Sequence, residues 1–290
     1  MRLIVVPAVR SGLFIALVTG LVFLPGCMTY EGGYGYGGTA PAPRTGPGIN
    51  LLSTQEEVAM GQQLAAEVES QERVLADPQL QGYINEIGQR LLRGVERTDL
   101  PYQFKLIDAP DTVNAFALPG GFMYIYTGLL KFCDDEGQLA SVMAHEIAHV
   151  AAYHHGESLT RQYGAQLLMN IVLGKQPSQT AQIAASLIGN SGMMYFSRQQ
   201  EYEADAKGLQ YLTRAGYPPA SMGQFMAKLA MEEGSGGAAG RPLLKLFSTH
   251  PPTRERLARI NAMAQQYPAP VPAPDLSTRY QREIARIGSS

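Results

Sequence analysis

The sequence lacks an excess of positive charge and contains very little cysteine. Its 23 Lys and Arg residues stand against 25 Asp and Glu, so the net charge is −2 and no basic surface invites nucleic acid, which we exclude as a partner. Of the two cysteines, Cys133 has no histidine or other base beside it in the sequence, which favours a packing role over a nucleophilic one. Hydrophobic residues form 45% of the 290, enough for one sizeable core and one domain.

Residues 1–26 have the features of an export signal. A basic stretch precedes an apolar run over 13–24, and about a dozen apolar residues are too few to span a membrane. The run ends in Leu-Pro-Gly-Cys, which resembles the lipobox of bacterial lipoproteins. That resemblance implies that Cys27 is lipidated and becomes the N-terminus and, because Met28 follows rather than aspartate, that the protein sits at the outer membrane. A plain secretory signal with an incidental cysteine is the alternative.

Composition divides the remainder into a linker, a domain and a tail. Residues 27–50 are mostly Gly, Tyr, Pro, Ala and Thr, with too little aliphatic content to bury, and we interpret them as a flexible tether. We expect the folded domain over 51–266, interrupted by a flexible glycine- and alanine-rich loop at 234–240. A Pro-rich tail follows over 267–290, with a short amphipathic helix at 276–287.

The apolar pattern predicts an α+β domain that is mainly helical and has one small sheet. Helices are expected at 54–70, 77–95, 136–154, 158–173, 180–193, 197–215, 220–233 and 253–265. Strands are expected between the second and third of these helices, at 102–106, 114–118 and 122–126.

Residues 145–149, His-Glu-Ile-Ala-His, form an H-E-x-x-H pattern. In a helix, positions i and i+4 share a face, so His145 and His149 can bind one zinc ion while Glu146 reaches a metal-bound water. The pentapeptide alone is weak, since a histidine pair on a surface helix is common. Here, however, four of the five histidines lie between 145 and 155, on an apolar helix that is costly to bury unless the imidazoles have partners.

Two segments offer a third ligand. His155 follows at a spacing like that of metzincins, but Ala152 stands where a glycine should turn the helix, so His155 is expected to point away. We favour Glu201, which shares a helix face with Asp205 whereas Glu203 does not. Asp205 can then orient a ligand histidine through its second ring nitrogen. A solvated acidic helix face is the alternative.

Four segments in order resemble one family of enzymes. They are NAFALPGG (114–121), HEIAHVAAYHH (145–155), SRQQEYEAD (197–205) and STHPPTRER (248–256). Together they are similar to the HtpX/BepA/LoiP-type gluzincin metallopeptidases, a group that also includes the CAAX prenyl proteases, and the layout is nearest to the small outer-membrane lipoprotein members. The resemblance covers about 51–266 and implies a zincin-like fold with H-E-x-x-H on the active-site helix.

The resemblance also implies residue roles. One zinc ion per chain is expected at His145, His149 and Glu201, with Glu146 as catalytic base and His154 in a structural role. In some periplasmic members the histidine that corresponds to His250 is a switchable fourth ligand that masks the metal. Since His250 precedes a proline it should be extended rather than helical, and a helix-capping histidine is the alternative.

Substrate contacts are less well defined by the sequence. By resemblance, gluzincins hold substrate as an added strand, which makes 121–127 a candidate edge strand with Gly121 and Tyr124 as contacts. Asn114 is a further candidate, or it caps a turn. A second oxyanion donor is also expected, and His250, Arg254 and Tyr195 are candidates.

The expected function is that of a periplasmic zinc metalloendopeptidase that cleaves unfolded or misassembled envelope proteins. The alternative is an assembly factor or chaperone for outer-membrane proteins, with latent protease activity or structural zinc. An intact Glu146 beside an open metal site speaks for the enzyme, because structural zinc is usually closed by four protein ligands.

Overall fold

The computed structural model describes residues 48–188, 196–234, 243–244, 246, 250–251, 253–268 and 275–287. The expected export signal, Cys27, most of the tether, Tyr195 and residues 235–240 lie outside the described residues. Among the helices that are described, none has the length and hydropathy that a membrane crossing needs.

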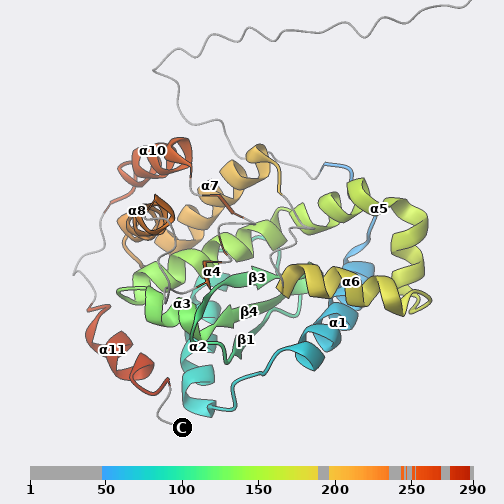
Figure 1. Cartoon of the computed structure of the whole chain (residues 1–290). Helices are drawn as coiled ribbons and strands as arrows, with labels where there is room; N and C mark the ends of the chain where they lie inside the picture. The colour runs from blue at the N-terminus through green and yellow to red at the C-terminus, as the bar shows by residue number, and fades with distance from the viewer. Residues whose placement is uncertain are drawn as a thin grey trace, which may run out of the picture. The chain divides into compact units, whose positions relative to one another are not determined.

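The described part of the chain is mainly helical (Figure 1). Its helices are α1 (Thr54–Gln71), α2 (Pro78–Leu92), α3 (Thr127–Phe132), α4 (Glu136–Ala151), α5 (His154–Val172), α6 (Pro177–Ile188), α7 (Arg198–Arg214), α8 (Ala220–Gly234), α10 (Arg254–Ala264) and α11 (Thr278–Ile284). Its strands are β1 (Gln103–Ile107), β2 (Thr112–Val113), β3 (Ala115–Ala117), β4 (Phe122–Tyr126) and β5 (Leu243–Leu244), with a 3-10 turn at Pro119–Gly121. The predicted fold class, a mainly helical α+β domain with a small sheet, is confirmed.

The small sheet has the order β1-β4-β3. β4 runs parallel to β1 and antiparallel to β3, in a register that places Phe116 opposite Tyr124. β4 is therefore central, and the expectation that it is an edge strand is wrong. β3 occupies the edge and, among the described residues, pairs only with β4. A separate parallel pair, β2 with β5, was not predicted, because two-residue strands leave almost no pattern in the sequence.

The two faces of β4 belong to different cores. Met123 and Ile125 pack in a cluster with α2, α4, α7 and α8, whereas Phe122, Tyr124 and Tyr126 pack with α1, α5 and α6. Figure 1 shows α4 lying between the sheet and the layer formed by α7, α8 and α10. Alternation along one central strand thus fixes which side of the sheet carries α4.

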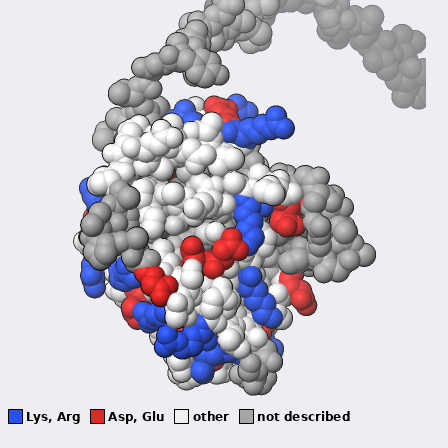
Figure 2. Space-filling view, turned by 90° about the vertical axis from the view of Figure 1, so that its left-hand side faces the viewer, with Lys and Arg blue, Asp and Glu red and all other residues white. Residues whose placement is uncertain are grey.

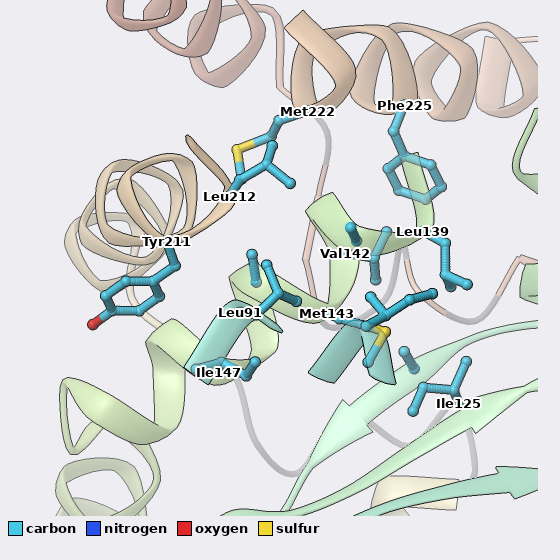
Figure 3. Close-up of a cluster of buried hydrophobic side chains, with 14 of the residues drawn as sticks. Leu91, Ile125, Leu139, Val142, Met143, Ile147, Tyr211, Leu212, Met222 and Phe225 are labelled. Carbon is cyan, nitrogen blue, oxygen red and sulfur yellow. The ribbon is translucent and has the colours of Figure 1, made fainter. Parts of the chain in front are cut away.

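α4 is buried along its entire length. Figure 3 shows Leu139, Val142, Met143 and Ile147 of this helix surrounded by side chains from α2, β4, α7 and α8. Asp135 caps the helix by accepting a hydrogen bond from the backbone N–H of Gln138 at 2.9 Å, which satisfies a donor of the first turn. The H-E-x-x-H residues are therefore held on the most enclosed helix of the domain.

The predicted break between the helices at 136–154 and 158–173 lies a few residues earlier in the structure. α4 ends at Ala151, Tyr153 adopts a left-handed conformation with φ of 60°, and α5 begins at His154. A second break lies within α5, where Gly164 has φ of 70° and ψ of 165°. Apolar periodicity continues across the break at Gly164, so the sequence pattern did not reveal it.

The C-terminal helix α11 packs against the domain. Tyr280 is fully buried and donates a hydrogen bond to the Leu130 carbonyl, and Arg279 forms two hydrogen bonds with Glu86 of α2. The packed region thus includes residues 275–287, which we had expected in a tail beyond 266. On the side of the molecule that carries α8, α10 and α11, both acidic and basic side chains are present (Figure 2).

Candidate metal centre

Two packed helices carry the residues that the sequence pattern singled out. α4 supplies His145 and His149, and α7 supplies Glu201 and Asp205. α7 begins with a capping box in which Ser197 and Gln200 bond each other's backbone, which fixes the first turn that bears Glu201. A Cβ placed on Gly208 would lie 3.1 Å from the backbone of His145, so glycine at this position lets the two helices approach closely.

Four potential ligands converge at one point. Donor atoms of His145, His149, Glu201 and His250 all lie within 4.8 Å of one another, and all four residues are buried. The Nε2 atoms of His145 and His149 are 3.1 Å apart, and each lies 3.5 Å from a Glu201 oxygen. A tetrahedral ion with bonds of about 2.0–2.1 Å requires donor separations of about 3.3 Å, so this donor set fits zinc.

His250 completes this group from outside the two helices. Its Nδ1 lies 3.3 Å from His145 Nε2 and 3.0 Å from Glu201 Oε1, while its Nε2 lies 3.3 Å from a Glu146 oxygen. The imidazole therefore stands between the other three ligands and Glu146. A side chain in this place occupies the position in which a catalytic zinc site keeps a water.

Glu146 faces the centre without joining the converging donors. It is almost completely buried, and burial raises the pKa of its carboxyl, although His250 and His145 oppose that rise. Its Oε1 makes no well-formed hydrogen bond among the described residues and faces His250 Nε2 at 3.3 Å. A buried carboxylate with a raised pKa beside a metal site is suited to accept and return a proton.

Asp205 and Arg256 contact the proposed ligands His145 and Glu201. Asp205 Oδ1 lies 3.1 Å from His145 Nδ1, which leaves His145 Nε2 for the metal. Arg256 donates to both Asp205 oxygens at 2.9 and 2.7 Å and lies 2.7 Å from Glu201 Oε2. Sequence reasoning missed Arg256 although it stands in the quoted segment STHPPTRER. The candidate donor Arg254, two residues earlier, is exposed.

These contacts set the charges of the centre. Burial alone would raise the pKa of Asp205 and Glu201, but Arg256 on the first and His250 with the α4 histidines on the second outweigh burial and lower both values. Burial alone would lower the pKa of His145, yet Asp205 and Glu201 outweigh it and raise that pKa to about 9. Two ionised carboxylates beside the imidazoles make an electrostatic environment that favours a divalent cation.

The remaining histidines take supporting places. His149 Nδ1 lies 2.9 Å from His154 Nδ1, so His149 presents Nε2 to the centre, and Phe196 stacks on its ring with a centroid separation of 3.9 Å. His154 Nε2 lies 3.6 Å from Glu203, which, as expected, does not face the metal group. His155 is buried outside the converging donors, and burial lowers its pKa to about 3.

An apolar pocket adjoins the centre on the side of α8. It is lined by Ser141, Val142, His145, Glu146, Asp205, Met222, Phe225, Met226, Leu229, Leu246, His250 and Arg256. Its walls are mostly hydrocarbon, and Glu146 and His145 form its end nearest the metal group. Its cavity volume is about 30 Å³, which leaves room for no more than a small group while His250 lines the pocket.

The three expected substrate contacts are scattered. Tyr124 donates to Glu69 at 2.7 Å on the α1 side of the sheet, away from α4. Gly121 packs against Tyr102. Asn114 is buried at the start of β3. Central β4 cannot accept an added strand, so neither Gly121 nor Tyr124 can serve as proposed.

Comparison with known proteins gives a consistent result. Residues 78–264 match Peptidase family M48. The "Beta-barrel assembly-enhancing protease" of Escherichia coli (strain K12) is 33% identical over 237 residues, 79% of this chain and 47% of that protein. The protein of the same name from Yersinia pestis is 34% identical over 224 residues, 74% of this chain and 45% of its own length.

A mitochondrial relative extends the comparison. "Mitochondrial metalloendopeptidase OMA1" of Schizosaccharomyces pombe is 30% identical over 178 residues, 61% of this chain and 51% of that protein. The chain thus spans about half the length of the curated relatives it matches.

Proposed function

Because this chain belongs to peptidase family M48 and is a metalloendopeptidase of that family, we propose that it cleaves unfolded or misassembled envelope proteins with one zinc ion. His145, His149 and Glu201 hold the ion in this proposal, and Asp205 orients His145. The observation that carries it is the convergence of these donors beside the buried carboxylate of Glu146.

Different residues of the chain have different roles in the proposed hydrolysis. Zinc bound here would polarise a peptide carbonyl and acidify a water. Glu146 takes the proton of the attacking water and returns it to the leaving amine, since its carboxyl is buried beside the metal group and has a raised pKa. Arg256 pairs with Glu201 and Asp205, and it lowers the pKa of Asp205, which keeps that carboxylate ionised.

We assign the substrate backbone to the edge of β3 rather than to β4. β3 pairs with one strand only among the described residues, and the backbone of Ala117 stabilises the ionised form of Glu146, so this edge runs beside the catalytic carboxylate. An extended peptide pairing with β3 gains main-chain hydrogen bonds without regard to its sequence, which suits unfolded substrates. Asn114, at the start of this edge, is the remaining candidate contact from the sequence.

His250 makes the proposed enzyme latent. As the fourth donor it excludes water from the centre and stands against Glu146, so turnover requires its displacement. The same closed arrangement favours a second function, assistance to the assembly of outer-membrane proteins, in keeping with relatives named beta-barrel assembly-enhancing protease. Both functions can reside in one chain that opens only on a suitable client.

The proposed setting is the periplasm, with a lipid on Cys27 that anchors the chain to the outer membrane. The apolar run before Leu-Pro-Gly-Cys supports it, and so does the composition of 27–50 as a tether between anchor and domain. Outer-membrane assembly machinery is then a candidate partner.

The direct test compares the wild type with Glu146→Gln on casein. The wild type should cleave casein and stop on addition of a chelator. Glu146→Gln should bind zinc in the same amount and cleave about 10²–10⁴-fold more slowly, since it removes general-base catalysis alone. A Glu146→Gln enzyme that cleaves casein as fast as the wild type would remove Glu146 from the mechanism.

A further inference from the structure

Four of the five exposed large hydrophobic side chains among the described residues lie on α5 or on the segment that hydrogen-bonds to it. There are five: Ile49 (76% exposed), Leu51 (52%), Met169 (37%), Leu173 (56%) and Met231 (76%). Met169 and Leu173 belong to the α5–α6 arm, residues 165–188, which follows the break at Gly164. Figure 1 shows this arm at the opposite end of the fold from α8, which carries Met231.

The inner face of the arm packs against the core, whereas its outer face is exposed. Leu168, Ile171 and Ile183 are buried in the cluster that includes α1. Ala165, Met169 and Leu173 follow one another at intervals of four, so they form a single stripe, and all three are exposed. Core packing therefore explains the inner residues and leaves the stripe unexplained.

The arm and the turns before it carry charge of one sign only. Residues 158–188 contain no Asp or Glu, in a chain that has 25 of them, and their two charged residues are Arg161 and Lys175. Both are exposed, and Lys175 lies in the turn between α5 and α6, next to Leu173 in the chain. An apolar stripe with basic flanks and no acidic residue complements an anionic bilayer surface.

The N-terminal segment reaches the domain at this same helix. The backbone N–H of Gly48 donates to Glu157, and that of Leu51 donates to Thr160 at 3.2 Å, so exposed Ile49 and Leu51 lie beside the first half of α5. Only twenty residues, 28–47, separate Gly48 from Cys27. Twenty residues span at most about 70 Å, which keeps α5 close to any membrane that holds a lipid on Cys27.

We propose that the outer stripe of α5, with Lys175, Ile49 and Leu51, rests on the anionic surface of the membrane to which the chain is anchored. This inference rests on the proposed lipid anchor at Cys27. The tether makes the contact intramolecular, so a small apolar stripe suffices where it would fail for a free protein.

A single-site fluorescent probe tests this contact on the full lipidated chain. Leu173→Cys is labelled with an environment-sensitive fluorophore, and Met231→Cys is the matched control, another exposed apolar position at the other end of the fold. The native Cys133 is buried and its pKa is raised, so it does not compete for the label. The proteins are reconstituted into vesicles of phosphatidylethanolamine and phosphatidylglycerol with or without spin-labelled lipid.

Spin-labelled lipid should quench the probe at position 173 at least about twofold and leave position 231 unchanged. Flotation of the vesicles tests the lipid anchor separately. A chain that does not float with the vesicles overturns both the anchor and this inference. A chain that floats with position 173 unquenched, or with both positions quenched equally, overturns the inference alone. Shielding of position 173 only when outer-membrane proteins are added would replace the lipid surface with a protein partner.

A second pair of variants excludes an effect of the probe. In the lipidated chain, vesicles should protect Lys175 from an amine-reactive reagent several-fold. Met169→Gln with Leu173→Gln should remove most of that protection, and Met231→Gln should leave it unchanged. Equal protection in all three proteins would contradict a role for the stripe.

Discussion

Three of the four converging donors lie on regular helices, and the fourth does not. His145 and His149 lie on a helix buried along its length, and Glu201 lies in the first turn of a helix that begins with a capping box. His250 precedes Pro251 and donates a backbone hydrogen bond to Leu246, which is itself helical, so it lies on neither α4 nor α7. The first three donors lie on helices packed in the core, and we therefore expect the fourth to be displaced more readily. Because of this difference, a site that has its three fixed zinc ligands can also be blocked by a fourth, displaceable one.

The largest effect should come from the fixed donors. Replacing His149 or Glu201 with Ala removes one of three core-held ligands, so zinc should be lost and casein cleavage should fall at least about a thousandfold. Glu203→Ala is the matched control, since Glu203 lies on the same helix but contacts His154 rather than the metal group. Zinc content by atomic absorption checks the change, and a Glu201→Ala protein that retains zinc would contradict the assignment.

A smaller effect should come from the residues behind the ligands. Asp205→Asn keeps the shape but loses the charge that orients His145 and pairs with Arg256, so zinc affinity should fall about 10–100-fold. Asp134→Asn serves as control because Asp134 pairs with Lys228 at the surface. Competition with a chelator measures both, and equal affinities would show that Asp205 does not tune the site.

The smallest effect should come from the residues that cap the helices next to the two kinds of ligand, the fixed and the displaceable. Ser197 caps α7, next to Glu201, and Thr253 caps α10, next to His250. Ser197→Ala and Thr253→Ala should each lower the free energy of unfolding by about 1 kcal/mol in urea titrations. Activity should fall in the first variant, which loosens a needed ligand, and rise in the second, which loosens the blocking one. Changes of the same sign would mean that both donors play the same part.

The sequence predicted the local part of the site well because helical spacing determines it. A period of four places His145 with His149, and Glu201 with Asp205, whatever the rest of the chain does. Burial of the histidines of α4 then required polar partners, and the structure supplies them on α7. These inferences needed no knowledge of which elements pack together.

What the sequence did not reveal depends on contacts between distant segments. Strand order decides whether β4 is central or at the edge, and alternating apolar residues look the same in both cases. Arg256 was missed because its partner Asp205 lies 51 residues away. Tyr280 of α11 was assigned to a tail because its burial depends on packing against α3, which no periodicity encodes.

The central claim, that His250 is a displaceable fourth ligand, is tested most directly by the rate of casein cleavage by His250→Ala at measured zinc content. Removal of the fourth donor should leave one zinc ion per chain and raise the rate at least about tenfold, as for release of a state held closed by about 1.4 kcal/mol. An unchanged rate with unchanged zinc affinity would show that His250 neither blocks nor binds the metal, and the comparison between fixed and displaceable ligands would fail.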